Sequence, residues 1–249
     1  MTTAVELSDR YANFLTHPLV PGPGVCRVCT GPAGAGYAVC RPCHETRRAL
    51  GSATADAVVP ISLAPKGEQY ANELWRYKNA AGPQRHYFRR GLAAVLWRFL
   101  VMHERCAADR CAVARFDAVT TVPSTHERTE HPLRLIVADM VGATRDRHRD
   151  LLIPTPRAAE LGRLPSGARY TASPLRGENV LLIDDTWASG NHAQSAAAAL
   201  KAGGAGSVAI VVLGRHLNGG FGDTAVHVER ARLRRFSWNV CPSRPWSHD

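Results

Sequence analysis

Residues 179–200, with the sequence NVLLIDDTWASGNHAQSAAAAL, decide how the rest of the chain is interpreted. The four apolar residues 180–183 are typical of a strand that is buried on both faces of a parallel sheet. Two adjacent carboxylates, Asp184 and Asp185, follow where this strand is expected to leave the sheet. Because paired acids at such a position usually hold a ligand, we expect a functional site here.

The residues after this stretch extend it into a larger unit. An Ala-rich segment at 191–202 is followed by Gly203 and Gly204, a pattern that predicts a helix with a glycine end signal. Residues 207–213 are apolar and β-rich, which predicts the next strand. The order of strand, loop, helix and strand is that of a right-handed βαβ unit.

Similar alternation precedes this unit. Apolar residues at helical spacing predict helices at 89–106 and 133–141, and β-rich runs predict strands at 116–122 and 151–153. Residues 161–177 are rich in Gly, Pro and Arg and are expected to form a mobile loop. The pattern predicts an α/β fold, with a parallel sheet flanked by helices.

Four of the seven cysteines form two CxxC pairs, CRVC at 26–29 and CRPC at 40–43. Two such pairs at short spacing suit a tetrahedral zinc site, so we expect structural Zn(II) on Cys26, Cys29, Cys40 and Cys43. A site closed by four thiolates leaves no coordination position for substrate. The other cysteines lack such spacing, and we expect them to be buried apolar residues: Cys106, Cys111 and Cys241.

Composition limits the class of protein. The chain has 249 residues, of which 45% are hydrophobic and 21% charged, as in ordinary globular proteins. Neither a signal peptide nor a membrane span is expected, because the apolar runs are short, and this predicts a cytoplasmic protein. The net charge of +10 favours phosphate-bearing or nucleic-acid partners, although a solvated basic surface would explain it equally. Basic residues are densest at 230–235.

Two common nucleotide-binding architectures do not fit the acid pair. A P-loop requires GxxxxGK followed by Ser or Thr, and the glycines at 31 and 36 are followed by Tyr37 and Ala38. A dinucleotide site of the Rossmann type requires GxGxxG, which the chain lacks. In a third arrangement, the loop 186–192 wraps a phosphate at the N-terminus of the following helix, and the acids bind neighbouring hydroxyls.

The segment VLLIDDTWASG, residues 180–190, resembles the motif with which type I phosphoribosyltransferases bind phosphoribosyl diphosphate (PRPP). The resemblance implies that Asp184 and Asp185 are catalytic residues that bind the ribose 2- and 3-hydroxyls. It also implies Mg(II) as a cofactor that binds with PRPP. Ala188 and His192 depart from the family, in which a hydroxyl residue is usual. The residues implied to bind the 5-phosphate are Thr186, Ala188, Ser189, Gly190, Asn191 and His192.

The order of motifs over most of the chain resembles that of the ComF-like family of phosphoribosyltransferase-related proteins. The motifs are the double CxxC ribbon, ELWRYKNAAG at 73–82, AVTTVPST at 118–125 and the PRPP motif. The resemblance implies a zinc-ribbon segment at 1–50 and a phosphoribosyltransferase-like domain at 51–249. ERTEHPLRL at 127–135 replaces the segment usual in the family, and Tyr77 and Lys78 match a feature that lies either near the site or on a solvated helix face. Candidates for contact with pyrophosphate, or else plain surface residues, are Ser124, Thr125, His126 and Arg128.

Two classes of function remain open. The first is an enzyme that transfers ribose 5-phosphate from PRPP to an acceptor that the sequence does not identify, with release of pyrophosphate. The second is a non-catalytic PRPP or nucleotide sensor, or a competence-type protein that handles single-stranded DNA. The sequence does not indicate an oligomeric state.

Overall fold

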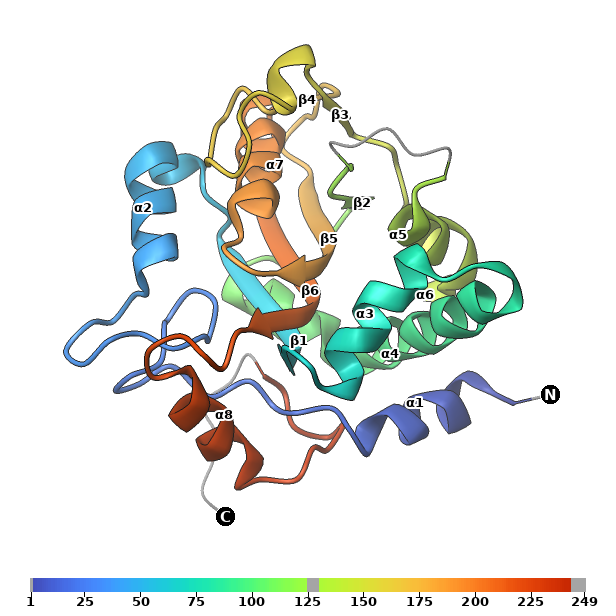
Figure 1. Ribbon diagram of the computed structural model, residues 1–249. Helices are drawn as coiled ribbons and strands as arrows, with labels where there is room; N and C mark the ends of the chain where they lie inside the picture. Colours follow the sequence, from blue (N-terminus) through green and yellow to red (C-terminus); the bar gives the residue numbers. More distant parts are fainter. Residues whose placement is uncertain (1, 125–129, 243–249) are drawn as a thin grey trace.

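The computed structural model describes residues 2–124 and 130–242, and it has the predicted α/β fold (Figure 1). Four parallel strands form the central sheet in the order β1-β6-β5-β2. The bounds of these strands are Ala57–Pro65 for β1, Ala118–Thr121 for β2, Asn179–Trp187 for β5 and Ser207–Leu217 for β6.

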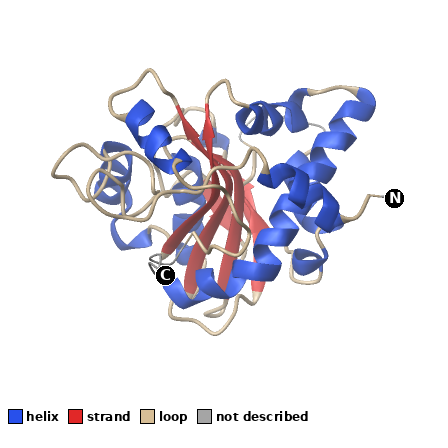
Figure 2. Cartoon of the chain, turned by 90° about the horizontal axis from the view of Figure 1, so that it is seen from below, coloured by secondary structure: helices blue, strands red, loops and turns tan. Residues whose placement is uncertain are grey.

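Helices cover both faces of the sheet (Figure 2). Leu181 and Ile183 of β5 pack into the core beneath α3 (Gln69–Asn79) and α4 (Gly82–Arg110). Val180 and Leu182 point to the opposite core, which contains α7 (Asn191–Ala202). Because successive side chains of a strand point to opposite faces, burial of both faces requires the continuous apolar run of this strand.

The remaining helices surround this framework. Helix α1 (Ala4–Ala12) packs on α4, and α2 (Arg41–Leu50) packs on α7. Helix α8 (Thr224–Arg232) contributes Val228 and Ala231 to a small cluster with Leu63 and Leu217 from the ends of β1 and β6. Shorter turns are α5 (Pro132–Leu135), a π-helical turn at Ile136–Met140, α6 (Gly142–Arg145), and 3-10 turns at Gly51–Ala53 and Pro156–Ala158.

Most predicted elements are confirmed, several of them with different bounds. The helix at 191–202 is α7, the helix at 89–106 lies within α4, and residues 133–141 are largely helical. The strand at 151–153 is not part of the central sheet. It corresponds to β3 (Leu152–Pro154), which pairs antiparallel with β4 (Tyr170–Ala172) in a separate two-stranded sheet.

The segment 161–177, expected to be a mobile loop, contains the short strand β4 and is anchored by Arg169. The Arg169 side chain is fully buried. Its guanidinium donates to the carbonyl oxygens of Ala158 (2.8 Å), Gly162 (3.0 Å) and Leu164 (2.7 Å). A buried guanidinium is stable only with such acceptors, so it holds the surrounding turns in place.

Candidate functional site

Asp184 and Asp185 lie within β5 rather than beyond it, which corrects the expected strand end. The strand continues to Trp187 through pairing with β6, whereas its pairing with β2 stops at Ile183 opposite Thr121. At the two acids, β5 therefore pairs with β6 but no longer with β2. This leaves an open position beside β5 at the carboxyl ends of the strands. Ligands of open α/β sheets usually bind at this end.

A pocket of about 280 Å³ occupies this open position beside β5. Its walls come from the end of α3, the segment between β2 and α5, and the end of β5 with the start of α7. Besides the two acids, its polar lining residues are Tyr77, Lys78, Ser124, His131, Thr186 and His192.

Two neighbouring residues of α3 bind the carboxylate of Asp185. The Tyr77 hydroxyl donates a hydrogen bond to Asp185 Oδ2, and Lys78 Nζ lies 2.5 Å from the same oxygen. Tyr77 is fully buried, while Lys78 is 30% exposed, so the ammonium group is accessible from the pocket. Lys78 therefore belongs to the site and not to a solvated helix face.

Asp184 is in a different electrostatic state. Desolvation by the surrounding protein, and next the adjacent negative charge of Asp185, raise the pKa of Asp184 from 3.8 to about 7. Lys78 and a 2.9 Å hydrogen bond from the Asp185 backbone N–H oppose this rise in pKa. The pair can therefore accept a proton near neutral pH, and a cation or hydroxyl donors in the pocket would favour its ionised form.

The loop between β5 and α7 has one strict steric requirement. Gly190 is the N-cap of α7 with φ of 81°, and a Cβ atom there would fall inside the indole ring of buried Trp187. Glycine is needed both for the left-handed conformation and for the space that the ring occupies. Gly190 therefore shapes the loop itself, whatever contact its backbone makes with a ligand.

Arg215 of the neighbouring strand β6 also holds the loop between β5 and α7 in place. Its buried guanidinium donates to the carbonyl oxygens of Trp187 (3.0 Å) and Ala188 (2.9 Å) and to that of its neighbour His216 (2.6 Å). Sequence reasoning did not single out Arg215, because an arginine in an apolar strand gives no local indication of its partners.

The predicted phosphate-binding residues separate into two groups. Thr186 and His192 line the pocket. Asn191 turns its side chain elsewhere, because its Oδ1 accepts a hydrogen bond from Thr46 (2.8 Å) and its amide donates to the Arg163 carbonyl. Ser189 Oγ accepts from the Asn191 backbone N–H (3.4 Å), Ala188 is exposed and Gly190 is buried. The first-turn amides of α7 remain the groups suited to an anion.

Of the predicted pyrophosphate contacts, Ser124 lines the pocket, and its backbone N–H donates to His131 Nε2 (3.0 Å). Thr125, His126 and Arg128 lie outside the described residues. His131 was missed from the sequence, although its position directly before Pro132 at the start of a helical turn could have indicated an N-cap residue.

The four cysteines of the CxxC pairs form a buried cluster in which all four sulfur atoms lie within 4.8 Å of one another. Cys29 Sγ and Cys40 Sγ are 3.7 Å apart. A tetrahedron with Zn–S bonds of about 2.3 Å has edges of about 3.8 Å, so the cluster fits zinc closely. The cluster is consistent with the expected structural zinc module. In contrast to expectation, the other three cysteines are partly exposed: Cys106, Cys111 and Cys241.

The cysteine cluster is packed against the loop of the acid pair. A Cβ atom on Gly31, two residues after Cys29, would lie 2.6 Å from a guanidinium nitrogen of Arg215. On the other side of the cluster, Thr46 of α2 donates to Asn191 at the start of α7. The ribbon therefore supports the loop through two separate contacts.

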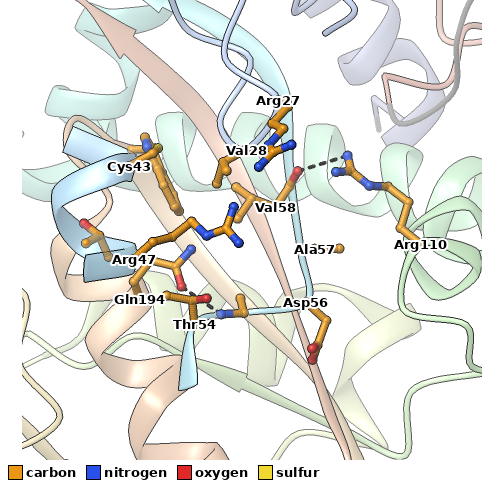
Figure 3. A pocket seen from close by; sticks show the side chains of 13 residues that line it. Arg27, Val28, Cys43, Arg47, Thr54, Asp56, Ala57, Val58, Arg110 and Gln194 are labelled. Carbon is orange, nitrogen blue, oxygen red and sulfur yellow. Dashed lines mark hydrogen bonds between the residues drawn. The ribbon is translucent and has the colours of Figure 1, made fainter. Parts of the chain in front are cut away.

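A second pocket, of about 200 Å³, lies where the ribbon meets the start of β1 (Figure 3). Arg27, Arg47 and Arg110 line it, and Arg110 donates to the Val58 carbonyl at 3.4 Å. Its carboxylate, Asp56, is paired with Lys201 at 2.7 Å. Cys43 of the four-cysteine cluster also lines this pocket.

The basic segment at 230–235 is partly engaged within the chain. Arg232 pairs with Glu68 at 2.6 Å, and Arg230 donates to the Pro23 carbonyl at 3.4 Å. Within the described residues, no helix combines the length and apolarity needed to cross a bilayer.

Comparison with known protein-family models gives no match, and comparison with curated protein sequences gives no significant match. The fold and the site thus define an α/β protein with a parallel sheet, a four-cysteine N-terminal cluster and a paired-acid pocket.

Removal of one cysteine ligand should release the zinc of this cluster. We expect Cys26→Ser or Cys40→Ser to lower tightly bound zinc from about one ion per chain to about none, with a lower melting temperature. Metal analysis after dialysis against a weak chelator measures the first effect. Cys111→Ser is the control, and equal zinc retention in all three variants would contradict the assignment.

The packing of Trp187 on Gly190 predicts a large effect from one methyl group. We expect Gly190→Ala to lower the free energy of unfolding by about 2–4 kcal/mol, because it adds backbone strain and displaces the indole ring. Gly219→Ala is a matched control, because no atom lies within 4 Å of its Cβ position and its φ is not in the left-handed region. Equal urea midpoints for both variants would refute the packing argument.

Proposed function

We propose that this protein binds PRPP in the acid-pair pocket and transfers ribose 5-phosphate to an acceptor, with release of pyrophosphate. The observation that carries the proposal is the convergence of Asp184, Asp185 and Lys78 on one pocket next to the N-terminus of α7. Such a pocket offers acceptors for ribose hydroxyls and donors for phosphate within one site. The resemblance of residues 180–190 to the PRPP motif, and of the chain to ComF-like proteins, supports the same proposal.

In this proposal the two acids have different roles in binding the sugar. Asp184 accepts hydrogen bonds from ribose hydroxyls and becomes ionised when the ligand binds. Asp185 is held in place by Tyr77 and Lys78, and it keeps the two carboxylates in a fixed orientation. Mg(II) bound with the diphosphate would supply positive charge, and carboxylate oxygens are ligands that suit it.

The transfer step requires no nucleophilic side chain. The bond from ribose C1 to the diphosphate oxygen breaks, its electron pair leaves with pyrophosphate, and a lone pair of the acceptor forms the new bond to C1. Lys78 and the first-turn amides of α7 stabilise negative charge at the two phosphate ends of PRPP, and this positioning lowers the barrier.

A sensor that binds PRPP without turnover is the second candidate. Ala188 and His192 favour it, because they replace hydroxyl residues that the resembling family uses at the 5-phosphate. Binding of single-stranded DNA has less support, because Arg230 and Arg232 already have partners within the chain. Pyrophosphate release in the presence of bases and amines distinguishes enzyme from sensor.

Calorimetric titration with PRPP in Mg(II) tests the proposed binding. We expect Asp184→Asn or Asp185→Asn to weaken PRPP binding at least about tenfold, because the amide keeps the shape of the carboxylate and loses its charge. Asp223→Asn removes the same charge from an exposed position whose side chain makes no helix cap. We expect no change in that control.

Two results would contradict this prediction. One is the absence of any PRPP heat with the wild-type protein. The other is unchanged affinity in the double variant Asp184→Asn, Asp185→Asn when circular dichroism shows that it is folded. Binding without detectable pyrophosphate release would favour the sensor over the enzyme.

The raised pKa of Asp184 predicts a pH-dependent cost to stability. Between its ordinary pKa of 3.8 and about 7, the folded protein holds a proton that the unfolded chain has lost, so stability falls as pH rises through this window. Asp184→Asn should therefore stabilise the ligand-free protein by about 1–3 kcal/mol at pH 8 and by much less at pH 4.5. Urea unfolding at both pH values measures this, and a stabilisation that does not depend on pH would argue against a titrating Asp184.

A further inference from the structure

A second group of possible metal ligands lies far from the four-cysteine cluster in sequence. It consists of His103 and Cys106 on α4 and Cys241 near the C-terminus. One ligand atom from each residue lies within 4.8 Å of the other two. Neither cysteine is part of a disulfide.

Helix geometry and the folding of the C-terminal segment bring these residues together. His103 and Cys106 are three positions apart on α4, a spacing that places two side chains on one helix face. The chain before Cys241 is anchored, because Trp238 Nε1 donates to the Ser8 carbonyl at 3.3 Å and Phe236 stacks on His17 with ring centroids 4.4 Å apart.

The imidazole of His103 is held in place by the C-terminal segment. Its Nε2 lies 2.6 Å from the carbonyl oxygen of Trp238. A carbonyl oxygen only accepts, so Nε2 carries the hydrogen and the lone pair of the neutral ring is on Nδ1. Metal-binding histidines usually donate their other N–H to such a carbonyl, which orients the ring. His103 is buried while both cysteines are partly exposed, so an ion can approach from the sulfur side.

We propose that His103, Cys106 and Cys241 form a second zinc site. Two thiolates and one imidazole suit Zn(II), and three protein ligands leave a fourth position for water or an exogenous ligand. Binding replaces the two thiol protons by the metal, so two protons leave for each ion bound. The site joins the C-terminal segment to α4, and its affinity is lower than that of the four-cysteine cluster because it has fewer ligands and more exposure.

Zinc titration of the full-length, reduced protein tests the proposal. We expect about two zinc ions per chain at saturation, of which a weak chelator removes about one. Cys106→Ser and Cys241→Ser should each bind about one ion and keep the tight one. Cys111→Ser is the matched control, because it is another partly exposed cysteine at the end of the same helix but lies outside the group, and it should still bind about two ions.

Cobalt substitution gives a readout that does not depend on stoichiometry alone. The second equivalent of Co(II) should add thiolate-to-metal absorption to the wild type and to Cys111→Ser, but not to Cys241→Ser. Saturation at one zinc in the reduced wild-type protein would overturn the proposal. So would a second equivalent that persists in both Cys106→Ser and Cys241→Ser, since it would then bind elsewhere.

Discussion

The buried guanidinium of Arg215 joins three parts of the chain that are distant in sequence. It belongs to β6, it binds two carbonyl oxygens of the β5–α7 loop, and Gly31 of the ribbon lies against it. It also interacts electrostatically with Cys29. Zinc bound by four thiolates would carry a formal charge of about −2, which a buried arginine beside it would partly compensate. The loop, the sheet and the four-cysteine module therefore constrain one another.

The acid pair shows how a candidate binding site opposes stability. Two adjacent carboxylates in partly desolvated surroundings repel each other. Tyr77 and Lys78 both bind Asp185, whereas Asp184 accepts a hydrogen bond from the Asp185 backbone N–H. The pKa of Asp184 is raised to about 7, so the ionised carboxylate lowers the stability of the folded protein. An apolar or amide residue would avoid this cost in folding free energy. Such a cost is typical of residues retained for binding, because a ligand supplies the compensation that the free protein lacks.

Several parts of the fold were readable from local patterns, and the exceptions have physical causes. The first strand was not predicted, although residues 57–65 are mostly apolar, and Pro60 in its middle weakens the local strand signal. A proline is tolerated in a strand at a sheet edge, and β1 lies at one edge of the central sheet. The strand at 151–153 was predicted from composition, but composition does not tell which partner a strand pairs with, and β3 pairs with β4 outside the central sheet.

The sequence by itself determined the cysteine spacing, the helix at Asn191–Ala202 and the apolar strand that carries the two acids, because these depend on residues adjacent in the chain. Only the tertiary structure decided which side chains complete the site. Lys78 reaches Asp185 from α3, His131 lines the same pocket from the segment before α5, and Arg215 reaches the loop from β6. Their roles depend on contacts between segments up to about a hundred residues apart, which packing of the two cores brings together and no local pattern encodes.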